Sequence, residues 1–201
     1  MSGHVCPFWA GYLLLNPLRR LLENPDKLLK PFVRPGMTVL EPGCAMGFFT
    51  LPLARLVGPD GRVIAVDIQP RMLTVLSRRA LKAGLARRIE IRGARADSLG
   101  IEDLHHTVDF AAALHVVHEM PDPNAFFSEV RQALKPDGRL LVIEPRGHVS
   151  TADFSQMEAV AGNAGFERDA AFSNPLKRRL LLRSWADPNP LVGRSSLSSR
   201  R

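Results

Sequence analysis

The sequence predicts an α/β protein built on a mostly parallel seven-stranded sheet, with helices on both faces and an antiparallel hairpin at one edge. Short apolar runs alternate with amphipathic segments along most of the chain, which is typical of strands and crossover helices in a parallel sheet. The last two apolar runs follow one another without a helical segment between them, which predicts the edge hairpin. A length of 201 residues fits one such domain.

Each expected element is bounded by turn residues or by residues that end helices. Strands are expected over residues 37–41, 63–67, 89–92, 108–114, 139–144, 166–171 and 179–183. Helices are expected over residues 48–56, 70–83, 124–134 and 151–164. Gly84 and Gly165 end two of these helices, and residues 135–138, Lys-Pro-Asp-Gly, form the turn before the fifth strand.

Two segments flank the main domain, which spans residues 33–185. Residues 1–32 form a helical arm of two short amphipathic helices, because Pro17 and Pro25 interrupt the helical pattern. This arm either packs on an edge of the core or forms a lid over a substrate pocket. Residues 186–201 are rich in Pro, Ser and Arg and are expected to be disordered.

The charge of the chain bears on which partners it binds, and its cysteine content bears on its cellular compartment. The net charge of +7 suggests either a nucleic-acid partner or a solvated basic surface, and the second is favoured because Lys and Arg are scattered along the chain. The densest basic group is residues 177–179. Cys6 and Cys44 fit a cytoplasmic protein better than a disulfide framework. No run approaches the roughly 20 apolar residues that a membrane span needs.

The turn after the first expected strand has the features of a cofactor cradle. Residues 41–47 read Glu-Pro-Gly-Cys-Ala-Met-Gly and lead directly into a helix. Glycine in such a turn permits positive φ and lets a ligand approach the backbone at the carboxyl ends of the strands. The second strand ends in Asp67, twenty residues after Gly47, where a carboxylate suits the hydroxyls of a ribose. A nucleoside cofactor is therefore expected.

The spacing of this turn bears on which nucleoside it takes. A dinucleotide fingerprint has the form G-x-G-x-x-G, so that backbone amides meet a pyrophosphate. Here Gly43 and Gly47 are spaced G-x-x-x-G, and Glu41 stands two residues before Gly43. A carboxylate there repels a pyrophosphate and suits the ammonium of a methionine moiety. An NAD(P)-dependent oxidoreductase is therefore disfavoured relative to a protein that binds S-adenosylmethionine.

Residues 39–47 resemble motif I of the class I S-adenosylmethionine-dependent methyltransferases, in which an acid and glycines follow the first strand. Glu41, Gly43 and Gly47 match this motif, and Ala45 stands where the motif usually has its middle glycine. The segments that are similar to the type-11 and ubiquinone/menaquinone-biosynthesis groups of this family are residues 108–110, 118–123 and 134–139.

The resemblance covers residues 36–165 and implies a Rossmann-like fold, methyltransferase activity and S-adenosylmethionine as the cofactor. In the family the acid that ends the second strand holds the ribose, which assigns this role to Asp67. The segment after the third strand usually holds the adenine, and Ala96 and Asp97 stand there. The cofactor-binding residues that the resemblance implies are Glu41, Gly43, Cys44, Ala45, Gly47, Asp67, Ile68, Ala96, Asp97 and Leu114.

Histidines at the end of the fourth strand are the candidate catalytic residues. His115 and His118 follow that strand, whose tip is expected to face the transferable methyl group. Imidazole takes up a proton near neutral pH, so either is a candidate general base, with Glu119 placed to orient it. In the alternative, His118 and Glu119 only anchor the loop and His115 contacts the cofactor. The His-x-x-His-Glu spacing does not predict a metal site, because Pro121 and Pro123 disfavour the helix that such motifs need.

The loop after the fifth strand supplies the candidate substrate-binding residues, Arg146 for an anionic group and His148 for the pocket wall. A solvated loop without a binding role is an equal alternative. The expected function is methyl transfer to a small-molecule acceptor. The basic charge makes an RNA methyltransferase the first alternative, although residues 114–117 lack the N/D-P-P-Y/F motif of the base-amino methyltransferases. A non-catalytic cofactor-binding or interaction protein is the second, because Ala45 departs from the motif.

Overall fold

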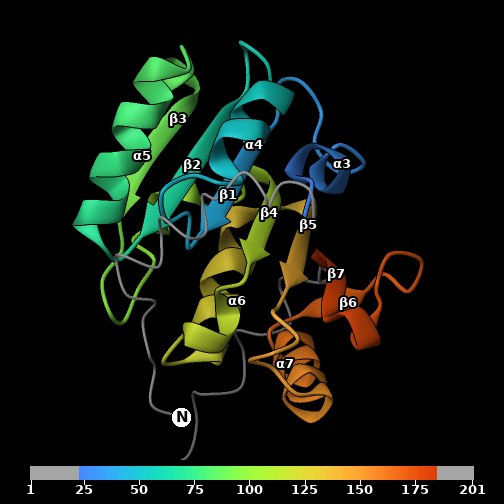
Figure 1. The fold of residues 1–201 in the computed structure, drawn as a ribbon. Helices are drawn as coiled ribbons and strands as arrows, with labels where there is room; N and C mark the ends of the chain where they lie inside the picture. The colour runs from blue at the N-terminus through green and yellow to red at the C-terminus, as the bar shows by residue number, and fades with distance from the viewer. Residues whose placement is uncertain (1–22, 185–201) are drawn as a thin grey trace, which may run out of the picture.

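The computed structural model describes residues 23–184, which form a seven-stranded sheet flanked by helices (Figure 1). The strands are β1 (Thr38–Pro42), β2 (Arg62–Asp67), β3 (Ile89–Gly93), β4 (Val108–Leu114), β5 (Leu134–Ile143), β6 (Phe166–Arg168) and β7 (Arg179–Ser184). Their order across the sheet is β3-β2-β1-β4-β5-β7-β6. Strand β7 runs antiparallel to β5 and β6, and the other described pairs are parallel. The predicted fold class, with its antiparallel edge, is confirmed.

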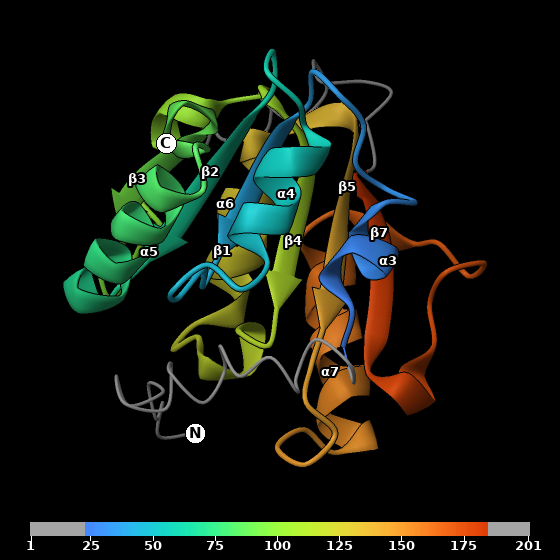
Figure 2. The ribbon, with the colours of Figure 1, turned by 45° about the horizontal axis from the view of Figure 1, so that its top comes forward.

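Helices cover both faces of this sheet. The α-helices of the described chain are α3 (Pro25–Leu29), α4 (Thr50–Leu56), α5 (Pro70–Lys82), α6 (Pro123–Ala133) and α7 (Thr151–Asn163). Figure 2 shows α4 in front of the sheet and α6 behind it. Helix α4 connects β1 to β2, α5 connects β2 to β3, and α6 connects β4 to β5. The strand order therefore reverses between β1 and β4, and such a switch point is where open α/β sheets bind ligands.

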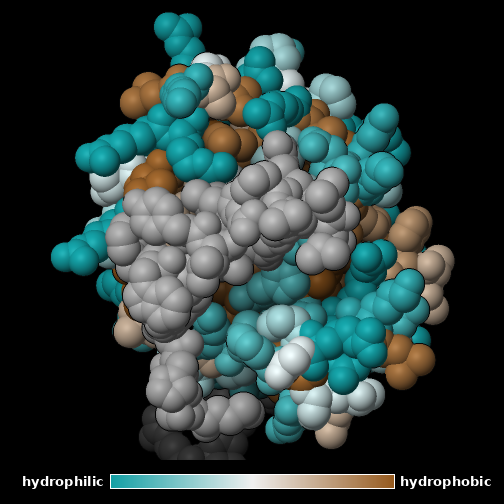
Figure 3. All heavy atoms as spheres, viewed as in Figure 1, coloured by the Kyte–Doolittle hydropathy of each residue, from teal (hydrophilic) through white to brown (hydrophobic). Residues whose placement is uncertain are grey.

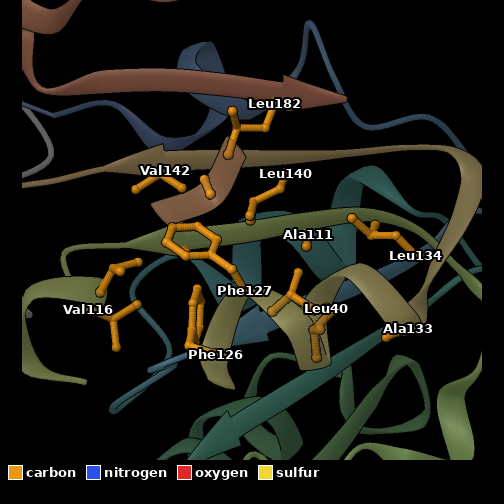
Figure 4. Packing of buried hydrophobic residues seen from close by; sticks show 14 of the residues in the cluster. Leu40, Ala111, Val116, Phe126, Phe127, Ala133, Leu134, Leu140, Val142 and Leu182 are labelled. Atoms are coloured by element: carbon orange, nitrogen blue, oxygen red, sulfur yellow. The ribbon is translucent and has the colours of Figure 1, made fainter. Parts of the chain in front are cut away.

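Two hydrophobic clusters fill the layers between the sheet and its helices. Successive strand residues face opposite sides, so Val39 of β1 and Phe110 of β4 pack toward α4 and α5. Leu40 and Ala111, their neighbours in sequence, belong to the cluster on the side of α6 and α7. Phe127 of α6 is fully buried in that second cluster (Figure 4), where burial of such a ring stabilises the fold by about 1.5–3 kcal/mol.

Side-chain caps fix the starts of α6 and α7. The Asp122 carboxylate accepts the backbone N–H groups of Asn124 at 2.8 Å and Ala125 at 3.3 Å. Ser150 and Asp153 form a capping box at the start of α7. Each cap contributes about 1 kcal/mol to the stability of its helix. Because Asp122 also ends the loop after β4, its cap helps to place the histidines of that loop.

The expected start of β5 is wrong. The strand begins at Leu134 rather than at residue 139, because the fully buried Leu134 pairs with Val108 of β4. The next pair joins Phe110 to Arg139, so the register shifts between the two. The expected turn at residues 135–138 is therefore an irregularity within β5.

The expected lengths of β6 and α4 are also wrong. Strand β6 ends at Arg168 rather than at residue 171, because the Asp169 carboxylate accepts the Ala171 N–H at 3.1 Å and turns the chain. Helix α4 begins at Thr50 rather than at residue 48, because the turn with left-handed backbone at Gly47 extends to that point.

Residues 23–32 are the described part of the predicted arm. Phe32 is buried, and its ring stacks on the Phe110 ring of β4 with 5.7 Å between centroids. This part of the arm packs on the same face of the sheet as α4. The rest of the predicted arm, residues 1–22, and the predicted disordered tail, residues 186–201, lie outside the described residues.

The described surface is mainly polar on the face seen in Figure 3, where hydrophilic side chains are interleaved with smaller hydrophobic areas. Exposed basic residues such as Lys82 and Arg168 belong to different elements of the fold. Within residues 23–184, no helix combines the length and the hydropathy that crossing a bilayer requires.

Candidate active site

A cavity of about 760 Å³ opens at the carboxyl ends of β1, β2 and β4, on the side of the switch point. Its size is typical of a pocket for a small molecule. The lining is rich in apolar side chains, among them Met46, Phe48, Phe49, Ile68, Leu114 and Phe126. Such a lining excludes water and strengthens the electrostatic interactions of the few polar groups inside it.

The turn after β1 and the end of β2 are held together by hydrogen bonds to one carboxylate. The Ala45 backbone N–H donates to Asp67 Oδ2 at 2.8 Å, and the Gln69 N–H donates to Asp67 Oδ1 at 2.8 Å. Burial raises the pKa of Asp67, while these backbone donors lower it. Ala45 has a φ of 45°, in the left-handed region that glycine adopts without strain. The turn therefore keeps the shape that a middle glycine would give it.

Close packing explains the two glycines of this turn. A Cβ atom on Gly43 would lie 2.3 Å from Val116 Cγ2, and one on Gly47 would lie 2.4 Å from Leu76 Cδ1. Both residues also have positive φ angles, 69° and 81°. Gly43 lines the cavity, whereas Gly47 lies outside the lining and lets the turn pack on α5.

Glu41 lies behind the turn rather than in the cavity lining. Its side chain is 2% exposed, and Oε2 has no hydrogen-bond partner among residues 23–184. Burial is the main reason that the pKa of Glu41 rises to about 8; the nearby Asp67 raises it further, and the Thr50 hydroxyl lowers it. A buried carboxyl group with an unused oxygen is a site that a cationic ligand can complete.

The other residues that the resemblance assigned to the cofactor lie on the cavity wall. These are Cys44, Ile68, Ala96, Asp97 and Leu114. Burial raises the pKa of the Cys44 thiol, so this side chain acts there as a small apolar group. The Asp97 side chain is 85% exposed and lies 3.6 Å from Arg95.

Some cavity residues were missed by the sequence analysis. They include Gln69, Met72, Leu99, Val116 and Phe126. Leu99 is placed by Glu129 of α6, whose Oε2 accepts its N–H at 2.8 Å. Gln69 could have been found from its place just after Asp67, but the others depend on packing between elements distant in sequence.

His115 connects the tip of β4 to the arm. Its Nε2 lies 2.9 Å from Glu23 Oε1, and its Nδ1 is buried with no hydrogen-bond partner in the described part of the chain. The residue has a φ of 61°, in the left-handed region, directly after the last residue of β4. The contact with Glu23 shows that this residue, two positions before α3, lies at this end of the cavity.

His118 and Glu144 form a pair at the ends of β4 and β5. His118 lines the cavity, and its Nδ1 makes a short hydrogen bond to Glu144 Oε2. Glu144 Oε1 accepts the Val117 backbone N–H at 2.8 Å. The hydrogen bond to Glu144 is the main cause that raises the pKa of His118, and burial opposes it. Glu119, the expected orienting residue, has Oε1 3.9 Å from His118 Nε2.

Of the two candidate substrate-binding residues in the loop after β5, one lines the cavity and the other does not. His148 lines the cavity, with its ring centroid 5.9 Å from that of His118. Arg146 is exposed and lies outside the cavity lining. The buried Arg178 side chain holds this loop, because its Nε donates to the Val149 carbonyl at 2.9 Å. Residues 23–184 hold no group of three His, Cys, Asp or Glu side chains that could bind a metal ion.

Comparison with known families settles what kind of domain this is. A family model described as a methyltransferase domain matches residues 34–181. The chain belongs to this family. S-adenosylmethionine is the methyl donor of these class I methyltransferases, as the resemblance implied. The match leaves the NAD(P)-dependent alternative without support.

Relatives with curated names are similar to this methyltransferase domain over part of their length. It is 34% identical over 139 residues to a ubiquinone/menaquinone biosynthesis C-methyltransferase of Hahella chejuensis, covering 67% of this chain and 55% of that protein. It is 40% identical over 142 residues to the protein of the same name from Ectopseudomonas mendocina, covering 67% and 54%. The chain therefore spans about half the length of the curated relatives it matches.

A solved structure shares the fold over nearly the whole domain. A SAM-dependent methyltransferase from Aquifex aeolicus superimposes with a TM-score of 0.77 at 25% identity. The match covers 90% of this chain and 98% of that one. The methyltransferase domain described here therefore has a structural relative of similar extent.

Proposed function

We propose that this methyltransferase domain transfers the methyl group of S-adenosylmethionine to a small-molecule acceptor in the cavity, with His118 as the general base. The observation that carries the proposal is that Asp67, at the end of β2, and His118, after β4, line one and the same cavity. One end of that cavity thus has the carboxylate expected for a ribose, and the other has a group that can take a proton.

The residues present fit the proposed methyl donor. Asp67 would hold the ribose hydroxyls, and Glu41 Oε2, which has no hydrogen-bond partner among residues 23–184, would accept a hydrogen bond from the ammonium of the methionine part. Ile68, Asp97 and Leu114 would flank the nucleoside. When bound, S-adenosylmethionine supplies an activated methyl group on a positively charged sulfur and is left as the neutral thioether S-adenosylhomocysteine.

The residues of the chain would position the acceptor, exclude water from the cavity and provide a general base. Methyl transfer needs an acceptor atom held about 3–3.5 Å from the methyl carbon, in a site that excludes water. Phe48 and Phe49 provide an apolar wall, and Glu23 covers the cavity beside His115. His118 takes the proton of an acceptor that loses one on methylation, because its Nδ1 is already engaged and its Nε2 remains for the acceptor.

A small-molecule acceptor fits the size and lining of the cavity better than a polymer does. A volume of about 760 Å³ suits one nucleoside donor with one small acceptor beside it. The similar proteins named above are biosynthetic C-methyltransferases, which makes hydroxylated ring compounds the first acceptors to test.

The donor is tested by calorimetry with S-adenosylhomocysteine on the purified chain. We expect binding by the wild type, and affinity about 10–100-fold lower for Asp67→Ala, since hydrogen bonds to a charged group contribute about 1.5–3 kcal/mol. Asp60→Ala, an exposed carboxylate outside the cavity, is the matched control and should bind as the wild type does. Absence of binding by the folded wild type would contradict the proposed donor.

The acceptor is tested by measuring S-adenosylhomocysteine release with a panel of hydroxylated aromatic compounds and with total RNA. We expect turnover with at least one small molecule and a large loss of turnover in His118→Ala. Turnover with RNA alone would replace the small-molecule proposal with the RNA alternative.

A further inference from the structure

Glu144 directly follows β5, and its side chain is fully buried against His118. We propose that Glu144 is a positioning residue: it holds His118 in the tautomer whose Nε2 lone pair takes the acceptor's proton. The inference rests on the proposed function for what Nε2 does, but the tautomer itself is a property of the protein alone.

The two oxygens of Glu144 have separate partners, and this fixes the direction of each hydrogen bond. Oε1 accepts the Val117 N–H at 2.8 Å, and Oε2 receives the short hydrogen bond from His118 Nδ1. A carboxylate only accepts hydrogen bonds, so the hydrogen between Glu144 and His118 belongs to Nδ1. In the neutral imidazole the second nitrogen, Nε2, then carries the lone pair.

The position of Glu144 is itself supported by Arg178, the residue just before β7. The Glu144 backbone N–H donates to the Arg178 carbonyl at 3.0 Å. The Arg178 guanidinium donates to Val149 O and to Pro175 O, both at 2.9 Å. This ties the end of β5, the His148 loop and the segment before β7 into one unit. Support of this kind limits how far a carboxylate can move, which is what a precise site requires.

Among residues 23–184, the ionisable side chains of Glu119 and His148 also face His118, and neither can replace Glu144. Glu119 Oε1 lies 3.9 Å from His118 Nε2, beyond hydrogen-bond distance and on the other nitrogen. His148 contacts the imidazole ring edge to face, with 5.9 Å between centroids. The tautomer is therefore set by Glu144.

The fixed tautomer gives the methyl transfer a balanced proton path. The acceptor gives its proton to His118 Nε2 and forms its new bond to the methyl carbon with the electron pair so released. The carbon–sulfur bond breaks with both electrons left on sulfur. The opposite tautomer presents an N–H to the acceptor and cannot take its proton.

Glu144→Gln is the decisive variant, because it has the same shape but reverses the tautomer. The Val117 N–H requires an acceptor, so the amide oxygen of the new side chain faces Val117. Its NH₂ group then faces His118 Nδ1, which must become the acceptor. The hydrogen consequently moves to Nε2.

Nitrogen-15 NMR of the imidazoles in the full chain measures the tautomer directly, at a pH that titration of the same signals shows to be above the raised pKa of His118. We expect the Nδ1–H tautomer in the wild type and in Glu119→Gln, and the Nε2–H tautomer in Glu144→Gln. We also expect the pKa of His118 to be lower in Glu144→Gln. An Nε2–H tautomer in the wild type overturns the inference, as does an unchanged tautomer in a folded Glu144→Gln protein.

The wild-type spectrum tests the inference even where Glu144→Gln fails to fold. Calorimetry with S-adenosylhomocysteine on the same samples separates this inference from the proposed function. We expect affinities for wild type and Glu144→Gln within about threefold of each other. If the wild type shows the Nδ1–H tautomer but no binding, the proposed donor fails while the positioning role of Glu144 stands.

Discussion

Ala45 donates its backbone N–H to the Asp67 carboxylate at 2.8 Å, which joins the turn after β1 to the end of β2. The same carboxylate accepts the Gln69 N–H, so it satisfies two backbone donors while it lines the cavity. Asp67 therefore has a structural task in addition to the binding task proposed for it.

Replacement of Asp67 should destabilise the fold as well as weaken donor binding. Asp67→Ala leaves the N–H groups of Ala45 and Gln69 without their acceptor, which costs about 1–3 kcal/mol of unfolding free energy. Asp67→Asn keeps one acceptor oxygen and should lose less. Urea denaturation measures both. Equal stability of Asp67→Ala and the wild type would show that these bonds do not hold the turn.

Gly43 should tolerate no side chain. The Cβ of Gly43→Ala would lie 2.3 Å from Val116 Cγ2 and would sit at a φ of 69°, so we expect a loss of about 1–3 kcal/mol in unfolding free energy. Gly147→Ala, where an added Cβ meets no atom within 4 Å, is the control and should change stability by less than about 0.5 kcal/mol.

A second substitution shows whether the contact with Val116 is the cause. Gly43→Ala combined with Val116→Gly removes the clash, because the added Cβ would otherwise lie 2.7 Å from Val116 Cβ as well, so the double variant should lose less than the sum of the two single variants. Additive losses would place the cost in the backbone conformation of Gly43 instead.

Glu41 should make the fold less stable as the pH rises. Its pKa rises from an ordinary 4.5 to about 8, mainly through burial, so the folded chain holds this proton more tightly than the unfolded chain does. The stability that this group contributes is complete below about pH 4.5 and is lost as the pH rises to about 8. The glutamine of Glu41→Gln does not titrate. The unfolding free energy of this variant, relative to that of the wild type, should therefore increase as the pH rises from about 4.5 to about 8.

Denaturation at about pH 4, 6 and 9 measures this difference. Glu167→Gln, an exposed residue of β6, is the matched control and should show no such gain. The same Glu41→Gln protein should bind S-adenosylmethionine less tightly, because a bound ammonium would favour the ionised form of the Glu41 carboxyl and an amide cannot ionise. A stability difference that is independent of pH would contradict the buried-carboxyl argument.

His118 should stabilise the fold most at acidic pH. The hydrogen bond to Glu144 raises the pKa of His118 above its ordinary 6.5. Stability from this pair is therefore complete below about pH 6.5 and is lost as the pH rises through the folded-state pKa. His118→Asn should accordingly destabilise the protein more at about pH 5.5 than at about pH 9. In a Glu144→Gln background this dependence on pH should become much smaller, and its persistence would show that another group raises the pKa.

Local patterns were enough to predict most of the fold. Apolar runs such as residues 63–67 and 108–114 form buried strands, because their side chains pack into the hydrophobic clusters on both faces of the sheet. The start of β5 was missed because Leu134 joins the sheet by pairing with Val108, a contact that the neighbouring Pro and Gly residues conceal. Turn residues indicate a bend, but they do not show whether the chain has already entered the sheet.

A site residue could be predicted from the sequence where it lies at the end of a strand that is itself predictable. Asp67 ends an apolar strand, and the structure brings it to the cavity beside the glycine turn. Glu144 ends the strand expected over residues 139–144 and directly follows β5 in the structure, so the same signal could have singled it out. The contact between His115 and Glu23 could not be found, because it depends on how the arm crosses the sheet. Arg146 faces solvent, since the fold of its loop and not its charge decides its direction.

Different strands support the two ends of the cavity, and the antiparallel strand β7 lies on the side of only one of them. The proposed donor side of the cavity is built by β1 and β2, whereas Glu144 and the His148 loop are held by β5 and by Arg178, the residue just before β7. Under the proposed function, changes in the loops around β7 would alter which acceptors bind and would leave the proposed nucleoside end unchanged. In such a scaffold, sequence changes at one edge of the sheet would be enough to change the acceptor.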